Sequence, residues 1–125
     1  MFLSSCSKDD ADTSFEASQL QKKWYFVSTT VGGQTFPYDD HEACGKDYVE
    51  FLANMTYRDV DVWDCVEYVE TGSWSMMDGN KLIVDGGEQI TIKSLSSTKM
   101  TLTLSYDYDD DGDVDTVTEK FTSVE

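Results

Sequence analysis

Residues 100–106 read Met-Thr-Leu-Thr-Leu-Ser-Tyr and carry the clearest structural signal in the chain. The large apolar side chains of Met100, Leu102, Leu104 and Tyr106 alternate with small hydroxyl side chains. A period of two places alternate side chains on opposite faces of a β-strand. Because one of the two faces is polar, the strand does not belong to a parallel sheet buried on both sides. The stretch therefore predicts a half-buried antiparallel strand.

Outward from this strand, runs rich in β-branched and aromatic residues are separated by turn signals such as Asp78-Gly79-Asn80 and Asp85-Gly86-Gly87. The runs span residues 24–31, 48–52, 55–63, 65–77, 82–84, 88–95 and 114–124. Gly72 is expected to bulge the fourth of these runs. Short strands joined by hairpin turns favour an antiparallel meander, and closing the meander into a barrel removes its exposed edges. The sequence predicts an all-β, eight-stranded antiparallel up-and-down barrel.

The remaining chain adds little regular structure. Residues 18–23 predict a short helix that Ser18 caps and Leu20 anchors. A chain of 125 residues is enough for one domain. We expect residues 1–17 to be a signal remnant and flexible tether and residues 18–125 to be the barrel domain.

The charge and the lack of reactive motifs exclude several functions. With 25 acidic and 9 basic residues the net charge is −16, whereas binding to nucleic acid requires a basic face. The one histidine, His41, lies among Asp39, Asp40 and Glu42. Neighbours on one loop cannot supply the geometry of a catalytic triad, so we expect a solvated acidic loop and no enzyme activity.

The N-terminal segment contains a candidate lipid anchor at Cys6. Leu3-Ser4-Ser5-Cys6 resembles the cleavage box of bacterial lipoproteins, and Ser7-Lys8-Asp9-Asp10 resembles the export signal of surface lipoproteins of Bacteroidetes-type bacteria. This resemblance implies acylation of Cys6 and a place in the cell envelope, as an outer-membrane lipoprotein that is surface-exposed or periplasm-facing. A signal peptide needs more than the five residues before Cys6, so the anchor requires a start upstream of Met1; with Met1 as the true start, Cys6 is a free thiol.

The body of the chain resembles the lipocalin-like domain lipoproteins of the same bacteria. The resemblance rests on Leu20 followed by Trp24, the pair Cys44 and Cys65, the strand Tyr48-Val49-Glu50-Phe51 and the run Gly72-Ser73-Trp74. Lys22 stands where the family's Leu-x-Gly-x-Trp signature has glycine. The resemblance implies a lipocalin-like barrel that binds a small apolar ligand.

For an exported domain of this kind we expect a structural disulfide between Cys44 and Cys65. It would close a loop of about 22 residues and contribute about 3 kcal/mol through chain entropy. The alternative, a redox pair, normally has Cys-x-x-Cys spacing, which these two cysteines lack.

An aspartate-rich segment near the C-terminus is a candidate calcium site. Asp107, Asp109, Asp111 and Gly112 match the first half of a calcium-binding loop, and Asp113 follows. The glutamate expected at position 12 of such a loop is Thr118, so the segment is not an EF-hand. The sequence leaves two interpretations, a weak Ca²⁺ site and a hairpin tip whose Asp and Gly residues only form the turn.

Large apolar side chains are expected to point into the barrel. They either line a cavity for one small apolar or planar ligand or fill the interior. With about 108 residues in eight strands, a filled or shallow barrel is favoured slightly. The alternative function is a structural or protein-interaction accessory subunit of a cell-envelope complex, with no small ligand. The expected ligand-binding residues are Trp24, Phe26, Phe51, Tyr57, Trp74, Leu102 and Leu104, and the other expected interior residues are Leu82, Ile90, Ile92 and Phe121.

Overall fold

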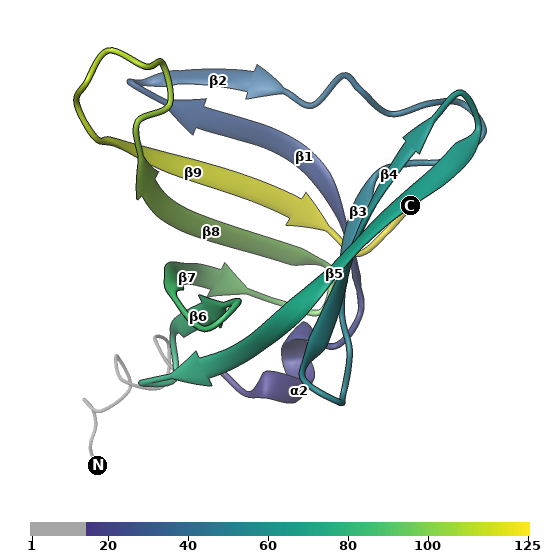
Figure 1. Ribbon diagram of the computed structural model, residues 1–125, viewed down its shortest axis with the longest axis horizontal. Helices are drawn as coiled ribbons and strands as arrows, with labels where there is room; N and C mark the ends of the chain where they lie inside the picture. Colours follow the sequence, from purple (N-terminus) through teal and green to yellow (C-terminus); the bar gives the residue numbers. More distant parts are fainter. Residues whose placement is uncertain (1–14) are drawn as a thin grey trace.

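The computed structural model describes residues 15–125, which form one closed antiparallel barrel and one short helix (Figure 1). Cys6 and most of the predicted tether lie outside the described residues. Among those described, no helix has the length and apolar character needed to cross a bilayer. The elements are α2 (Ala17–Leu20), β1 (Lys23–Val31), β2 (Gln34–Pro37), β3 (Tyr48–Phe51), β4 (Thr56–Trp63), β5 (Val66–Met77), β6 (Lys81–Val84), β7 (Glu88–Leu95), β8 (Lys99–Tyr106) and β9 (Asp115–Thr122).

The strands form a 9-stranded sheet in the order β2-β1-β3-β4-β5-β6-β7-β8-β9, and pairing of β1 with β9 closes it. β2 pairs only with the end of β1, through Ser28–Val31, while β3 pairs with the beginning of β1, through Lys23–Tyr25. β2 is therefore a side hairpin, and the other eight strands form the closed barrel. The predicted fold class is confirmed.

Gly72 does not bulge its strand, contrary to the prediction. The register of β4 with β5 runs without a shift through the pair Tyr57 and Gly72. The shifts occur instead between Phe26 and Ser28 and between Ile92 and Ser94. A Cβ at Gly72 would lie 2.5 Å from the Tyr57 ring, so glycine is needed for the close approach of that ring.

The helix is shorter than the predicted 18–23 and starts one residue earlier. Its N-cap is Glu16, whose N–H donates to the Gln19 side-chain oxygen at 2.7 Å, so Ser18 is not the cap. The helix ends at Leu20 because the chain is extended from Lys23 onwards to pair with β3. Lys22, in the position of the family's glycine, directs its ammonium to the Ser97 carbonyl at 3.1 Å.

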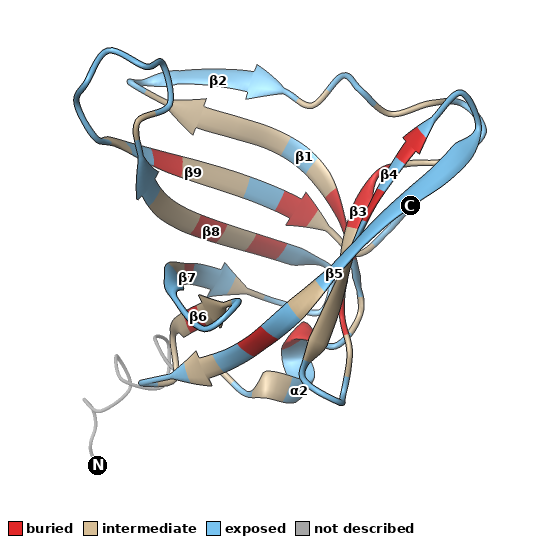
Figure 2. Cartoon of the chain, in the orientation of Figure 1, coloured by how far each residue is buried: buried red, intermediate tan, exposed pale blue. Residues whose placement is uncertain are grey.

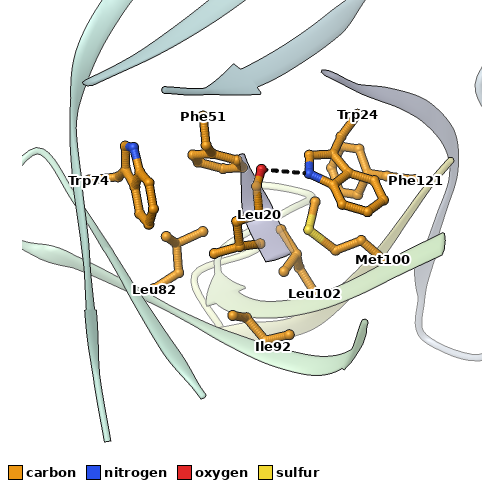
Figure 3. Packing of buried hydrophobic residues seen from close by; sticks show 9 residues of the cluster. All are labelled: Leu20, Trp24, Phe51, Trp74, Leu82, Ile92, Met100, Leu102 and Phe121. Atoms are coloured by element: carbon orange, nitrogen blue, oxygen red, sulfur yellow. Dashed lines mark hydrogen bonds between the residues drawn. The ribbon is translucent and has the colours of Figure 1, made fainter. Parts of the chain in front are cut away.

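The core fills the end of the barrel next to α2 (Figure 3). Leu20 and Trp24 are completely buried, and the indole N–H of Trp24 donates to the Leu20 carbonyl at 3.0 Å. By contrast β5 is exposed along most of its length (Figure 2). The buried cluster comprises Leu20, Trp24, Phe51, Trp74, Leu82, Ile92, Met100, Leu102 and Phe121.

Candidate binding cavity

Two cavities that share Phe26 and Asp59 occupy the part of the barrel that the core does not fill. The inner one, of about 230 Å³, lies directly on the core and has mostly apolar walls. It is lined by Phe26, Val49, Phe51, Tyr57, Asp59, Leu82, Val84, Glu88, Ile90, Leu102, Glu119 and Phe121. The barrel is thus partly filled, with a small apolar space above the filled end.

The structure separates the seven predicted ligand-binding residues into two main groups. Phe26, Phe51, Tyr57 and Leu102 line the inner cavity. Phe51 and Leu102 also belong to the packed core, whereas Trp24 and Trp74 belong to the core alone. Leu104, half-buried on β8, lies in neither group. Of the other expected interior residues, Leu82 and Phe121 belong to both the core and the cavity lining, Ile90 lines the cavity and Ile92 is in the core.

Both buried tryptophans are tied to the backbone, which explains why they fill space instead of lining it. The N–H of Trp74 donates to the Leu52 carbonyl at 3.2 Å, as that of Trp24 does to Leu20. Phe51 packs edge-on against Trp74, with ring centroids 5.4 Å apart. A ring that is both hydrogen-bonded and packed has one orientation, so these tryptophans form a fixed floor.

The outer cavity, of about 470 Å³, is acidic. The inner faces of β4 and β5 contribute Asp59, Asp61 and Glu70, and the segment before β3 contributes Asp40 and Asp47. Its other lining residues are Phe26, Tyr38, Val60 and Tyr68. Every charged residue that lines either cavity is an Asp or a Glu, since the inner cavity adds only Glu88 and Glu119.

These carboxylates repel one another across short distances. Asp59 and Glu70 are directly paired in the register of β4 with β5, an arrangement that destabilises a sheet when both are charged. Partial removal from water, then repulsion from Glu70, raises the pKa of Asp59. Partial burial also raises the pKa of Glu119, with repulsion from Asp59 and Glu88 adding to it; the weak Thr29 hydroxyl contact, at 3.4 Å, acts in the opposite direction.

His41 has a structural role, contrary to the prediction of a solvated loop. Its Nδ1 accepts the backbone N–H of Asp47 at 3.1 Å, so the neutral ring carries its hydrogen on Nε2, which donates to the Phe26 carbonyl at 2.8 Å. The Tyr38 ring lies against His41 and stacks on Phe26, with centroids 4.6 and 5.1 Å apart. These contacts attach the loop between β2 and β3 to the edge of the cavity.

Asp47 is the buried acid that supports this loop, and sequence patterns did not single it out. Only 2% of its surface is exposed, and its carboxylate accepts the Val62 N–H at 2.7 Å and the Tyr38 hydroxyl. Burial and then this hydrogen bond strongly raise the pKa of Tyr38. The only local sign is that Asp47 immediately precedes a strand, which is too common a pattern to be informative.

Cys44 and Cys65 form a disulfide with Cα atoms 5.7 Å apart, which confirms the predicted pairing. The bond joins the loop before β3 to the two-residue turn between β4 and β5. Asp64 and Cys65 both have positive φ in this turn, and the Glu42 carboxylate accepts both of their N–H groups at 3.0 Å. The disulfide and Glu42 therefore hold the same hairpin tip.

The aspartate-rich segment forms the loop between β8 and β9. The carboxylates of Asp107, Asp109, Asp111 and Asp115 approach within 4.8 Å of one another. Asp113, which the sequence placed in this group, is not a member, and Asp115 takes its place because β9 begins there. The Asp107 carboxylate already accepts the N–H groups of Asp111 and Gly112, at 3.2 and 2.9 Å, as turn-forming aspartates do.

Comparisons with known proteins agree with this architecture. A family model described as a lipocalin-like domain matches residues 20–102. The cockroach major allergen Per a 4 has a similar structure, with a TM-score of 0.60 at 14% identity over 89% of this chain and 72% of the allergen. Bovine odorant-binding protein in complex with undecanal gives a TM-score of 0.51 at 17% identity, covering 88% and 74% of the two chains. A search of curated protein sequences finds no match.

Proposed function

Because the chain belongs to the lipocalin-like domain family, we propose that it is a non-enzymatic binding protein of the cell envelope that holds one small apolar ligand inside its barrel. The supporting observation is the inner cavity, whose walls are mainly aliphatic and aromatic and whose floor is rigid. Small-molecule sites are typically apolar cavities with a few polar groups that orient the ligand. The undecanal bound by the bovine odorant-binding protein indicates the ligand type, a short aliphatic chain.

A fluorescent apolar probe, N-phenyl-1-naphthylamine, tests this function directly. We expect saturable binding with micromolar affinity and competitive displacement by decanol. Val49, which lines the inner cavity, offers a blocking variant: Val49→Trp puts a large ring into the space and is expected to weaken binding at least about tenfold. Val69→Trp is the matched control, because Val69 is exposed on the outer face of β5.

Equal binding by Val49→Trp and Val69→Trp would place the probe outside the barrel. Absence of saturable binding by the unaltered protein would instead favour a structural or protein-interaction accessory subunit of an envelope complex. That second function is supported by the exposed apolar side chains of Trp63 and Val66 at the β4–β5 hairpin, which are 67% and 51% exposed.

We further propose that the barrel is tethered to the outer membrane through acylated Cys6. The support is the lipoprotein-like run Leu3–Cys6 and the acidic residues after it, which belong to the part of the chain outside the described residues. Expression of the natural reading frame with labelled palmitate is expected to label the protein and place it in the membrane fraction. Cys6→Ala should remove the label and release the protein, and a labelled or membrane-bound Cys6→Ala protein would contradict the anchor.

A further inference from the structure

The lining changes from apolar in the inner cavity to acidic in the outer cavity. The inner cavity ends on the aliphatic and aromatic core, whereas the outer one is lined by Asp40, Asp47, Asp59, Asp61 and Glu70. Phe26 and Asp59 belong to both linings, so the two spaces adjoin at these residues. A molecule that fits both needs an apolar tail and a polar head that tolerates several carboxylates.

The acidic lining has no basic partner within the described part of the chain. The ion pair found there joins Arg58 to Glu50 at 3.3 Å, and neither residue lines a cavity. Asp59 and Glu70 are directly opposite each other on β4 and β5. Two like charges in this position destabilise a sheet, so the pair has no benefit for the fold itself. A positive group between β4, β5 and the loop before β3 would relieve this repulsion.

Aromatic rings in the same cavity provide a second recognition element. Phe26, Tyr38 and Tyr68 line the outer cavity together with the carboxylates. The faces of aromatic rings attract cations, and cages of aromatic rings are used to recognise ammonium groups. Acidic and aromatic groups around one space are therefore suited to an ammonium head, and an anionic head would be repelled there.

We propose that the preferred ligand is a small cationic amphiphile, with its apolar chain or ring in the inner cavity and its ammonium group in the outer one. This inference rests on the proposed function. It assigns recognition of the ligand's positive charge to residues of β4, β5 and the β2–β3 loop. Asp59 lies where the apolar part and the ammonium head of the proposed ligand would meet, because it lines both cavities.

Three probes with the same chain length test the proposal: decyltrimethylammonium, decanol and decanoate, each measured by displacement of N-phenyl-1-naphthylamine. We expect decyltrimethylammonium to bind about tenfold more tightly than decanol, through attraction of its charge to the carboxylates and aromatic rings, and decanoate to bind most weakly. Added salt should weaken binding of the cation and leave binding of decanol nearly unchanged.

The net charge of −16 attracts any cation, so a matched pair of variants separates the cavity from the overall field. Both side chains are exposed, but Glu70 lines the outer cavity, whereas Glu67, three positions earlier on the same strand, lies on the opposite face. Glu70→Gln is expected to weaken binding of decyltrimethylammonium about fivefold with decanol unchanged, and Glu67→Gln to leave both unchanged.

The outcomes distinguish the two proposals. If decanol and the fluorescent probe bind but the three charge types bind alike, or if decanoate binds best, the inference is wrong and the proposed function remains. Equal effects of Glu70→Gln and Glu67→Gln on the cation would also overturn the inference, because the attraction would then come from the whole surface. If neither the fluorescent probe nor any decyl compound binds, both proposals fail.

Discussion

At the scale of single residues, Trp24 fixes the floor of the cavity. It has no exposed surface, and its indole N–H is satisfied by the Leu20 carbonyl. The Leu20 carbonyl also accepts the Lys22 N–H at 2.8 Å, so Trp24→Phe removes one of its two hydrogen bonds and leaves a void where the larger ring was. We predict that this variant lowers the free energy of unfolding by about 2 kcal/mol. Chemical denaturation measures the change.

Trp63 gives the control for this prediction, because its side chain is 67% exposed. Trp63→Phe is expected to change stability by less than about 0.5 kcal/mol. If Trp24→Phe were as stable as Trp63→Phe, the closed end of the barrel would not be the packed floor described above.

At the scale of elements, the disulfide between Cys44 and Cys65 connects the β2–β3 loop to the β4–β5 hairpin. Removing it opens, in the unfolded state, the loop closed by two cysteines with a sequence separation of 21, so we predict that the double variant Cys44→Ser, Cys65→Ser loses about 3 kcal/mol of stability. Thermal melts of the oxidised, reduced and double-variant proteins measure this. Melting temperatures that coincide in all three would show that Glu42 alone holds the hairpin tip.

The loop between β8 and β9 carries the predicted calcium site. Four aspartates converge there, and desolvation followed by hydrogen bonding with Asp111 raises the pKa of Asp109. We predict weak, millimolar Ca²⁺ binding that raises the melting temperature, and loss of that rise in Asp109→Asn. Asp113→Asn, outside the converging group, should retain it. No rise at millimolar Ca²⁺ would leave the loop as a turn only.

At the scale of the whole molecule, the acidic groups that line the cavities make stability depend on pH. The folded-state pKa values of Asp59 and Glu119 are raised, so their charged forms are less favourable in the folded protein than in the unfolded chain. Their contribution to stability is fully present below the unfolded pKa values and is lost as the pH rises through the folded values. At neutral pH both carboxylates therefore destabilise the barrel.

We predict that Asp59→Asn raises the free energy of unfolding at neutral pH by about 0.5 kcal/mol, the size of one like-charge pair across strands. The gain should disappear as the pH falls below the ordinary aspartate value of about 4, where the native carboxyl is also neutral. Denaturation of both proteins over this pH range measures the difference. Loss of stability in Asp59→Asn at neutral pH would contradict the repulsion.

The strands and most of the turns were predictable because their causes are local in the sequence, whereas the cysteine pairing was expected from the resemblance to an exported domain. The alternation at 100–106 is seen in the burial of Met100 and Leu102 on β8 but is lost by Tyr106, which is exposed. Asp78-Gly79 and Asp85-Gly86 both adopt the positive φ values of tight turns. Prediction was poorer at Gly72 and at the helix. Gly72 responds to the Tyr57 ring on a neighbouring strand, and the four-residue helix is set by its cap and by the start of β1.

The sequence by itself determined short antiparallel strands joined by tight turns, because side-chain period and turn chemistry act over a few residues. The Cys44–Cys65 bond was expected from the resemblance to an exported domain and not from any local pattern. Only the tertiary structure decided which large side chains fill the barrel and which line a cavity. Only in the folded chain does Asp59 lie opposite Glu70, with Asp40 lining the same outer cavity. Only there does His41 hold the β2–β3 loop through its hydrogen bond to the Phe26 carbonyl. Strand register and barrel closure bring distant residues together, and 25 similar acidic residues carry no local mark of which ones will meet.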